Sequence, residues 1–509
     1  MTERARRAGG RAARVAARQA PEKLVHPALP GQVGGRYAPL TNSEIESVLA
    51  TAYRILEDIG FAEVPDLVRD RALEHGCFVN ALGRLSFPRP FVQDIVAGAC
   101  KRFTFHGRDP RHTIEVGGDR VYFGTGGAAV QTLDLETGHY RPSTLQDLHN
   151  FTRLIDRLDN ISWFTRCCIA TDIEDAFDVE INTAYALMKN TQKPVGMSFT
   201  FDNHVDAAVE LFDHVAGGVG QFAKAPFCKA HISPVISPLR YGEDAVDVML
   251  ACVRHNLPIN AIIAAQSGAT APAPLAGMLA QTTAETLAGL ILVNLFAPGY
   301  PVIFSNWPFV IDLRTGAFCG SGGEIALLNA GAAQIGNYLG LPTGVASSMA
   351  DAKAVDAQMG AEKSLTAALC GLAGANMIYE SAGMMASLLG VSFEAFVLDD
   401  EMLGTVHRSI RGIEVTEETL GFEAILSAVT GDGHFLGGAH TLAAMERDYL
   451  YPKLANRDSP AMWNKGGTPD AWQTAREKAE EILENHQPDY LGNACDQRIR
   501  SRFNILDQS

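Results

Sequence analysis

Two short stretches of the sequence combine aromatic rings with polar groups in a pattern suited to holding a cation. Trp307 follows one predicted strand, and Tyr379 with Glu380 ends another. Facing rings attract a bulky cation by about 0.5–2 kcal/mol each, and a carboxylate can balance its charge. Phe199 and Phe304, taken singly, fit a barrel core equally well. The combination of Trp307, Tyr379 and Glu380 favours a site, because Trp and Tyr need polar partners and Glu is costly to bury unpaired.

Three further polar residues, Arg166, His231 and Asn306, stand at the ends of predicted strands. In a barrel of parallel strands, reactive groups gather at the C-terminal ends of the strands. We therefore expect these residues around the same opening as the rings. No residue is assigned a catalytic role. No metal site is predicted, because a catalytic zinc needs three clustered ligands, and His231 and the pair Cys167-Cys168 lie on different predicted strands.

A repeating pattern between residues 119 and 411 supplies the elements that position these groups. Short apolar or small-residue runs are typical of strands buried on both faces, and helical stretches separate them as in strand–loop–helix units. The strands are predicted at residues 121–124, 161–170, 194–201, 227–233, 258–265, 301–305, 341–347 and 376–380. The helices are predicted at 145–158, 177–189, 205–216, 243–255, 276–295, 324–339, 357–373 and 393–410.

This alternation predicts an α/β fold, a TIM (β/α)8 barrel with a helical N-terminal region and a helical C-terminal layer. A doubly wound open sheet is the alternative, which would show fewer strands and a phosphate-binding loop. Four regions are predicted: a basic, Pro/Gly-rich extension (1–40), a mostly helical region (41–118), the barrel (119–411) and the C-terminal layer (412–509).

Three helix starts carry recognisable signals. Thr41-Asn42-Ser43-Glu44 opens a helix, and Ser143 with Gln146 three residues later has the spacing of a capping box. Residues 471–483 have the pattern of an amphipathic helix with mixed charges. These signals support helices on both sides of the predicted barrel.

Charge and composition narrow the classes of partner. The chain of 509 residues has a formal net charge of -16, which disfavours nucleic acid but not a small cationic ligand. Residues 2–20 carry six arginines and one acid. We interpret them as a basic extension that docks on an acidic neighbouring subunit, so a homo-oligomer is expected. A transit peptide or an anion-binding arm is the functional alternative.

Cysteine usage and hydropathy indicate the compartment. The nine cysteines form no C-x-x-C and are odd in number, which indicates reduced thiols in the cytoplasm. The most apolar run, residues 287–297, is interrupted by Gly289 and Asn294 and stops at Pro298-Gly299. It is shorter than a membrane span and is predicted to be a buried helix, so no association with a membrane is expected.

Two motifs imitate cofactor sites. Gly124-Thr125-Gly126-Gly127-Ala128-Ala129 fits G-x-G-x-x-A, but residues 130–135 alternate like a strand and meet a turn, which predicts a hairpin rather than a dinucleotide-binding helix. Asp432-Gly433-His434-Phe435-Leu436-Gly437 fits the D-x-H-x-x-G pattern of cobalamin-binding modules. Such a module needs an α/β domain downstream, whereas the residues after Gly437 are polar and helical. We interpret this match as accidental.

Several blocks, in this order along the chain, resemble the trimethylamine methyltransferase superfamily. They are Gly340-Leu341-Pro342-Thr343-Gly344, Asp351-Ala352-Lys353, Asp356-Ala357-Gln358, Glu362-Lys363-Ser364-Leu365, Ala373-Gly374-Ala375-Asn376, Ser381-Ala382-Gly383-Met384, His434-Phe435-Leu436-Gly437, His440-Thr441, Trp463 and Gly466-Gly467. The resemblance covers the barrel and the C-terminal layer.

The resemblance implies a TIM barrel that moves a methyl group from a methylated amine to the cobalt of a separate corrinoid protein. It implies no corrinoid bound tightly by this chain. Founding members of the superfamily carry pyrrolysine, whereas this sequence has ordinary residues, and the replaced position is placed within 341–353. Members without pyrrolysine use quaternary amines, so the predicted donor is glycine betaine or a similar compound.

The resemblance gives the strand-end residues their expected roles. Phe199, Phe304, Trp307 and Tyr379 would surround the cation, and Glu380 or Asp351 would balance its charge. A betaine carboxylate would be bound by Arg166, His231, Asn306 or Lys353.

Three other functions remain open. Methyl transfer from trimethylamine is one, and a non-catalytic barrel that binds quaternary amines is another. The third is a lyase or aldolase barrel, which would need a lysine at a strand end for a Schiff base or a metal carboxylate cluster. We expect no lysine in the strand interiors, which disfavours this third function.

Overall fold

A computed structural model describes residues 27–506 of the chain. These residues form two compact units: residues 29–412 with 452–506, and residues 413–451 with 27–28. The first unit contains the barrel. The arginine-rich stretch at 2–20 lies outside the described residues. The predicted boundaries of the four regions remain a prediction.

The barrel consists of eight parallel strands in a closed ring. In ring order they are β6 (Arg120–Phe123), β20 (Met377–Tyr379), β19 (Thr343–Ala346), β16 (Val302–Asn306), β14 (Ile259–Ile263), β11 (Cys228–Ile232), β10 (Val195–Ser198) and β9 (Phe164–Thr165). A parallel bridge between Gly124 and Trp163, with the bond from Ser162 N to Phe123 O (2.8 Å), joins β9 back to β6. The ring confirms the predicted TIM barrel, and the alternative of an open sheet is wrong.

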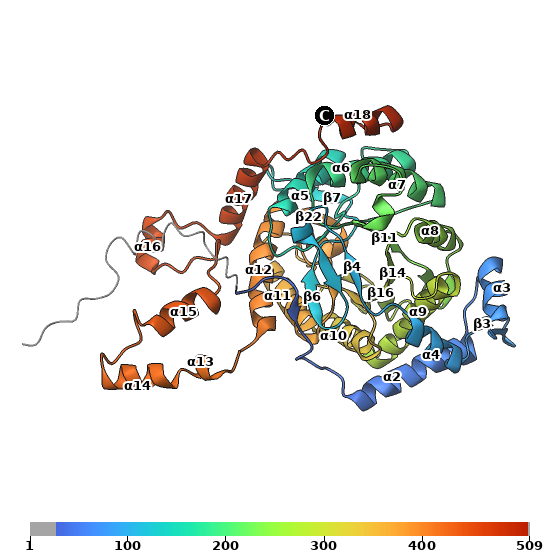
Figure 1. Ribbon diagram of the computed structural model, residues 1–509, viewed down its shortest axis with the longest axis horizontal. Helices are drawn as coiled ribbons and strands as arrows, with labels where there is room; N and C mark the ends of the chain where they lie inside the picture. The colour runs from blue at the N-terminus through green and yellow to red at the C-terminus, as the bar shows by residue number, and fades with distance from the viewer. Residues whose placement is uncertain (1–26, 507–509) are drawn as a thin grey trace, which may run out of the picture. The chain divides into compact units, whose positions relative to one another are not determined.

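Helices surround this ring of strands (Figure 1). They are α5 (Leu145–Asp156), α6 (Ala176–Asn190), α7 (Asp202–Ala216), α8 (Glu243–Arg254), α9 (Leu275–Phe296), α10 (Gly323–Tyr338), α11 (Ala357–Ala373) and α12 (Phe393–Arg411). All eight predicted helices are present. The predicted capping box of α5 is wrong by one residue, because Thr144 with Asp147 forms it. Helix boundaries depend on which hydroxyl reaches the free amides, which spacing alone leaves ambiguous.

Interior glycines allow large side chains to fill the barrel. A Cβ at Gly124 would collide with the Trp163 ring, and one at Gly196 would lie 2.8 Å from the Lys229 side-chain nitrogen. Barrel interiors are packed in layers, so a residue without a side chain on one strand admits a bulky one from its neighbour. These two glycines therefore set where Trp163 and Lys229 can lie.

The region before the barrel covers its side and its N-terminal end. It contains β1 (Gln32–Val33), α2 (Asn42–Arg54), the π-helix η1 (Ile55–Ile59), α3 (Asp66–Glu74), β2 (Phe78–Val79), β3 (Leu85–Ser86), α4 (Arg89–Gly98), β4 (Phe103–Phe105), η2 (Pro110–His112) and β5 (Ile114–Val116). Thr41 and Glu44 form the capping box of α2, which packs with α4 against α9. The loop of the β4–β5 hairpin includes Arg108, whose amide bonds Gln192 O ahead of β10.

Helix α9 is long and apolar enough to cross a membrane by length and composition. However, 83% of its most apolar window is buried inside the protein. It lies between α2, α4 and the strands β14 and β16. The prediction of a buried helix in this segment is confirmed.

Small sheets follow several strands at their C-terminal ends. The strands are β7 (Gln131–Leu133), β8 (Tyr140–Pro142), β12 (Val235–Ile236), β13 (Arg240–Tyr241), β15 (Gln266–Ser267), β17 (Phe309–Ile311), β18 (Phe318–Cys319), β21 (Met384–Met385) and β22 (Gly390–Ser392). The 3₁₀ turn η4 (Ala386–Leu388) lies between β21 and β22, whereas the 3₁₀ turn η3 (Phe222–Lys224) precedes β11. β7 and β8 are antiparallel, which confirms the predicted hairpin after Gly124.

The C-terminal part of the chain is helical. In the barrel unit, α16 (Pro460–Lys465) precedes α17 (Ala471–Asn485), which packs against α12 and α5, and α18 (Asn493–Arg502) packs against α7. The predicted helix at 471–483 is therefore confirmed. The second unit contains α13 (Glu417–Leu420), α14 (Phe422–Thr430) and α15 (Ala439–Arg447).

Candidate active site

Four rings from different strands meet inside the barrel around Tyr379. The centroid of its ring lies 5.2 Å from that of Trp307, 5.3 Å from Trp163 and 5.3 Å from His231. Tyr379 ends β20, His231 lies in β11, and Trp307 directly follows β16. Closure of the barrel thus brings together side chains that are far apart in the sequence.

Unpaired polar atoms follow three neighbouring strands of the barrel. Among the described residues, the buried side-chain atoms Oδ1 and Nδ2 of Asn306, Nε1 of Trp307, Oγ of Ser348 and Oε2 of Glu380 have no hydrogen-bond partner. These residues come at or just after the ends of β16, β19 and β20, which are adjacent in the ring. Buried polar groups are normally bonded, so this concentration of free donors and acceptors indicates a place prepared for a polar ligand.

Two of these residues have a strained backbone. Ser348 (φ 72°) and Glu380 (φ 62°) adopt the left-handed conformation just beyond the ends of adjacent strands. Such a conformation costs a non-glycine residue about 1–3 kcal/mol and is concentrated at functional sites. The strain turns two polar side chains away from the directions that the strands would give them.

The carboxyl group of Glu380 is pressed against a glycine loop. A Cβ added at Gly126 would lie 2.7 Å from Glu380 Oε1, and one at Gly127 would lie 2.8 Å from Oε2. Burial raises the pKa of Glu380 to about 8, and the charge of Lys363 opposes this rise. Without a ligand the group is therefore largely protonated at neutral pH, and a cation beside it would favour the carboxylate.

A lysine lies beneath the ring cluster, and its presence is a correction to what the sequence predicts. Lys229 belongs to β11, within a predicted strand, so the expectation of no lysine in the strand interiors was wrong. Its side-chain nitrogen lies 3.1 Å from Thr165 Oγ1 and 3.2 Å from His231 Nε2. It also lies 4.9 Å, 5.3 Å and 5.5 Å from the ring centroids of Tyr379, Phe105 and Trp163.

The environment of Lys229 is apolar and aromatic. Burial lowers the pKa of this amine to about 7. A lysine can enter a barrel interior in this way because its amine sheds its charge more readily than a guanidinium does. Cation–π contact with the three rings favours the protonated amine, but the lowered pKa shows that burial outweighs this contact.

His231 connects the lysine to the ring cluster. Its Nε2 faces Lys229 and, at 3.3 Å, Thr165 Oγ1. Burial, reinforced by the charges of Lys229 and Arg166, lowers the pKa of His231 well below its usual value. A neutral ring that accepts at Nε2 carries its proton on Nδ1 and can donate it to a ligand.

Arg166 adds a third basic group on this side of the site. It directly follows β9, and burial lowers the pKa of its guanidinium, while the charge of Glu180 counteracts that effect. Arg166, Lys229 and His231 therefore form a basic side, and Glu380 supplies an acidic group. A site with these two characters suits a ligand that has a positive and a negative end.

Several residues of the predicted site lie outside the ring cluster. The Phe304 ring points outward, where its Cδ1 would lie 3.3 Å from a Cβ at Gly336 of α10. Phe199 is buried beyond β10 and makes no ring contact with Tyr379 in the described part of the chain. Asp351 Oδ1 accepts bonds of 2.6 Å from Gly320 N and Ser387 Oγ, so it joins two loops. Lys353, the fourth expected carboxylate donor, is exposed.

Trp163, Lys229 and Ser348 received no role from the sequence pattern. Trp163 stands at the start of a predicted strand, whereas reactive groups are expected at the C-terminal ends. The interior glycines Gly124 and Gly196 are the signal that could have found Trp163 and Lys229, since each leaves space for a large neighbour.

The described residues contain neither a metal-ligand cluster nor an α/β module after the D-x-H-x-x-G match. Residues 27–506 contain no group of three or more His, Cys, Asp or Glu side chains that could hold a metal ion. The D-x-H-x-x-G match at 432–437 lies in the exposed connection between α14 and α15. Only helices follow it in the described part of the chain, so these residues do not form an α/β module for a corrinoid.

Comparison with known proteins assigns the family. A profile described as trimethylamine methyltransferase (MTTB) matches residues 7–504. The chain belongs to this family. Membership in the trimethylamine methyltransferase family makes the protein a methyltransferase and confirms the resemblance inferred from the sequence blocks.

Curated relatives of the family match over nearly their whole length. A trimethylamine methyltransferase of Desulfitobacterium hafniense is 31% identical over 467 residues, 91% of this chain and 93% of the relative. A glycine betaine methyltransferase of the same species is 28% identical over 472 residues, 92% and 97% of the two chains. A trimethylamine methyltransferase of Methanosarcina barkeri is 30% identical over 458 residues, 88% and 90% of the two chains.

Among solved structures, the monomethylamine methyltransferase of Methanosarcina barkeri resembles the chain. It has a TM-score of 0.45 and 13% identity, and covers 90% of this chain and 96% of its own. A complex of a protein of the same name with hydroxylamine has a TM-score of 0.47 and 12% identity, with the same coverage.

Proposed function

We propose that this methyltransferase moves a methyl group from a quaternary amine, glycine betaine or a similar compound, to Co(I) of a corrinoid carried by a separate protein. The coarser part, methyl transfer from a methylated amine, is supported by relatives named as trimethylamine and glycine betaine methyltransferases. The finer choice of a quaternary amine rests on the chemistry of the site and of the donor.

The observation that carries the proposal is the contact between the rings of Trp307 and Tyr379, with Glu380 directly after Tyr379 in the chain. The two rings lie 5.2 Å apart, and the adjoining carboxyl group has a buried oxygen without a partner among the described residues. A quaternary ammonium has no N–H to donate, so it is recognised by ring faces and by charge rather than by hydrogen bonds. These three groups supply both.

The basic side of the site fits the other end of a betaine. His231 Nδ1, the Arg166 guanidinium and Asn306 Nδ2 are donors that a substrate carboxylate can accept from. A donor held at both ends presents one N-methyl carbon in a fixed direction. Positioning of this kind can supply much of the rate of a displacement reaction.

The leaving group favours a quaternary donor. Displacement of a methyl group from a quaternary ammonium releases a neutral tertiary amine, whereas the same displacement from trimethylamine would release an amide-like anion. The corrinoid, when present, supplies the nucleophilic cobalt that accepts the methyl group. The residues of this chain have to bind the donor, orient it and exclude water, and no proton transfer is needed.

The methyl acceptor belongs to a partner in this proposal. The helical segment after residue 432 supports this assignment, because it does not build a corrinoid-binding module. All nine cysteines are free, which supports a reducing compartment, and we place the protein in the cytoplasm. We also propose that it forms a homo-oligomer.

The test is methyl transfer to free Co(I) cobalamin, followed by the absorbance change on methylation. Glycine betaine and related quaternary amines should give product, and trimethylamine should not. Trimethylamine as the sole effective donor would overturn the choice of a quaternary amine. Tight binding of quaternary amines without any methyl transfer, with free cobalamin or with a corrinoid protein, would instead favour a non-catalytic binder.

A further inference from the structure

A buried ion pair lies behind the strained residues of the site. Lys363 Nζ of α11 and Asp399 Oδ2 of α12 are 2.9 Å apart, and each side chain is 1% exposed. Burying two charges costs more than their attraction returns unless their remaining hydrogen bonds are well used. The partners of these bonds therefore indicate why the pair is there.

Each member of the pair also binds the backbone of a site loop. Lys363 Nζ donates to Ser348 O (3.0 Å), and Asp399 Oδ2 accepts from Gly383 N (2.8 Å). Ser348 follows β19, and Gly383 comes three residues after Glu380 in the loop that follows β20. One ion pair thus joins the two loops that carry the left-handed residues.

Neighbouring side chains of α11 hold the rest of the first loop. Thr366 Oγ1 accepts from Ser348 N (3.1 Å), and Glu362 Oε2 accepts from Asp351 N (2.8 Å) and Ala352 N (3.1 Å). A strained conformation persists only where surrounding contacts determine it fully. The loop from Ser348 to Ala352 meets this requirement through α11 together with backbone bonds between residues 350–352 and 384–387.

The second loop is held closely against α12. Gly383 has a φ of 78°, and a Cβ at this position would collide with the ring of Phe396. Only glycine allows the backbone to come so near to the helix that its amide reaches Asp399. The hydrogen bond from Gly383 N to Asp399 Oδ2 therefore fixes how closely the loop that contains Glu380 approaches α12.

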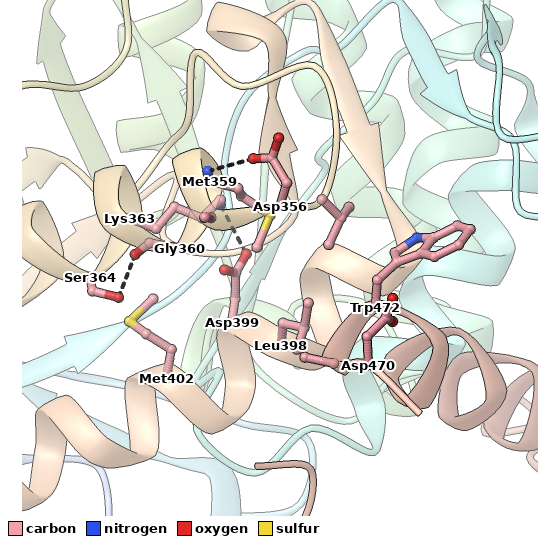
Figure 2. Close-up of a pocket in the computed structure, with 13 residues that line it drawn as sticks. Asp356, Met359, Gly360, Lys363, Ser364, Leu398, Asp399, Met402, Asp470 and Trp472 are labelled. Atoms are coloured by element: carbon pink, nitrogen blue, oxygen red, sulfur yellow. Dashed lines mark hydrogen bonds and ion pairs between the residues drawn. The ribbon is translucent and has the colours of Figure 1, made fainter. Parts of the chain in front are cut away.

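The pair also lies against a cavity beside α11, α12 and the start of α17. Lys363 and Asp399 line a cavity of about 520 Å³ on the flank of the barrel, together with Met359, Leu398, Met402 and Trp472 (Figure 2). In this view the Lys363 side chain reaches from α11 to Asp399 across the cavity wall. Neither residue needs to touch the substrate to act on the site.

We propose that Lys363 and Asp399 are positioning residues, which hold Ser348 and Glu380 in their left-handed conformations and so aim both side chains into the site. This role rests on the proposed function only for its catalytic consequence. Its structural consequence is the order of two loops, which can be measured without any reaction.

The experiment separates positioning from stability. Replacing one partner leaves a buried charge alone, so Lys363→Met and Asp399→Asn should both lower the melting temperature. The double variant Lys363→Met with Asp399→Leu removes both charges, and such apolar replacement often restores stability. We expect its melting temperature to recover, while its kcat for methyl transfer stays reduced by up to about 100-fold.

A second readout follows the loops directly. In the double variant, amide hydrogen exchange should become faster in residues 348–352 and 381–383 and stay unchanged in the barrel strands. Lys193→Met is the matched control. Lys193 lies just before β10 and is also buried, and its side-chain nitrogen donates to Ile155 O (2.9 Å) and Ile161 O (2.7 Å) rather than to either loop. This control should lower stability without faster exchange in either loop.

Two results would overturn the proposal. One is a double variant with restored stability, unchanged exchange in both loops and full kcat, since the pair would then have only a structural role. The other is equally fast loop exchange in Lys193→Met, since the loops would then respond to any loss of stability. If the wild type transfers no methyl group, the proposed function fails, and the exchange data still decide the role of the pair.

Discussion

The side-chain nitrogen of Lys229 lies 4.9 Å from the centroid of the Tyr379 ring. Tyr379 thus contacts Lys229, a basic group of the protein beneath it. The same ring belongs to the candidate ligand site with Trp307 and Glu380. A ring with a protonated amine near it attracts a second cation less strongly, because the two positive charges repel each other. The low pKa of Lys229, about 7, reduces this competition.

The first prediction concerns the pH dependence of cation binding. The pKa of Glu380 is raised to about 8, so below that pH the carboxyl is protonated and must lose its proton to balance a cation. Affinity for a quaternary amine should therefore rise with pH up to about 8, and binding at pH 7 should release a proton. Calorimetry in buffers of different ionisation enthalpy measures this release.

Glu380→Gln is the variant that checks the assignment. It should weaken binding on the order of tenfold or more, because the amide cannot become a counter-charge. Between pH 6 and 8 its affinity should rise less steeply than that of the wild type, and the rise that remains comes from deprotonation of Lys229. Proton release as large as in the wild type would assign the titration to a group other than Glu380.

The second prediction compares two kinds of ring. Trp307→Leu and Tyr379→Leu should each raise the dissociation constant of a quaternary amine, since a cation–π contact contributes about 0.5–2 kcal/mol. Tyr379→Phe keeps the ring and should retain most of the affinity. Titration calorimetry gives the three values.

Phe304→Leu is the control for these rings. Phe304 belongs to β16, the strand that Trp307 follows, but it faces α10. Its truncation should lower the melting temperature and leave the dissociation constant unchanged. A Phe304 variant that loses affinity as strongly as the Trp307 variant would contradict the outward orientation.

The third prediction is a stability effect of Lys229. The pKa of the amine in the folded protein, about 7, is below its value in an unfolded chain, so between pH 7 and 10 the unfolded chain binds more protons. This difference makes the Lys229 contribution to the free energy of unfolding rise with pH in that window, against the opposite contribution of buried thiols such as Cys228, whose pKa is raised to about 12. Lys229→Met should lose this rise, and the exposed Lys224→Met should keep it, as chemical denaturation at several pH values would show.

The fourth prediction concerns the glycine loop next to Glu380. In Gly126→Ala the new Cβ would lie 2.7 Å from Glu380 Oε1, so the carboxyl must move. We expect kcat/KM to fall by about tenfold or more, because small displacements of a positioning group are costly. Gly98→Ala, where a Cβ meets nothing within 4 Å, should leave kcat/KM unchanged. Equal kcat/KM in the two variants would show that Glu380 can move away from the new Cβ without loss of activity.

The order of the barrel elements was predictable, whereas the direction of side chains was not. Apolar runs such as β16 lie between helices and the barrel interior, so both faces are buried and the sequence does not alternate. Nothing in the run 302–306 therefore distinguishes the outward Phe304 from the inward Ser305. Trp307 and Tyr379, whose rings lie 5.2 Å apart, could be placed at strand ends from the sequence, because strand ends, unlike faces, are marked by the loop after them.

Two misses have a common physical cause. Lys229 was overlooked because a charged residue is not expected inside a strand, although a desolvated amine can be neutral there. Ser348 was given no role because its left-handed conformation depends on Lys363 and Thr366, which lie in the next helix. Both depend on tertiary contacts, which no local pattern contains.

The hairpin of β4 and β5 limits how reactants can arrive. The ring of Phe105, at the end of β4, lies 5.3 Å from the Lys229 nitrogen at the foot of the barrel. On the proposed function, we expect donor and acceptor both to approach from the C-terminal ends of the strands, the side on which barrel enzymes bind their substrates. The small amine then has to enter before the bulky acceptor covers this side, so steady-state kinetics should follow a compulsory sequence in which the amine binds first.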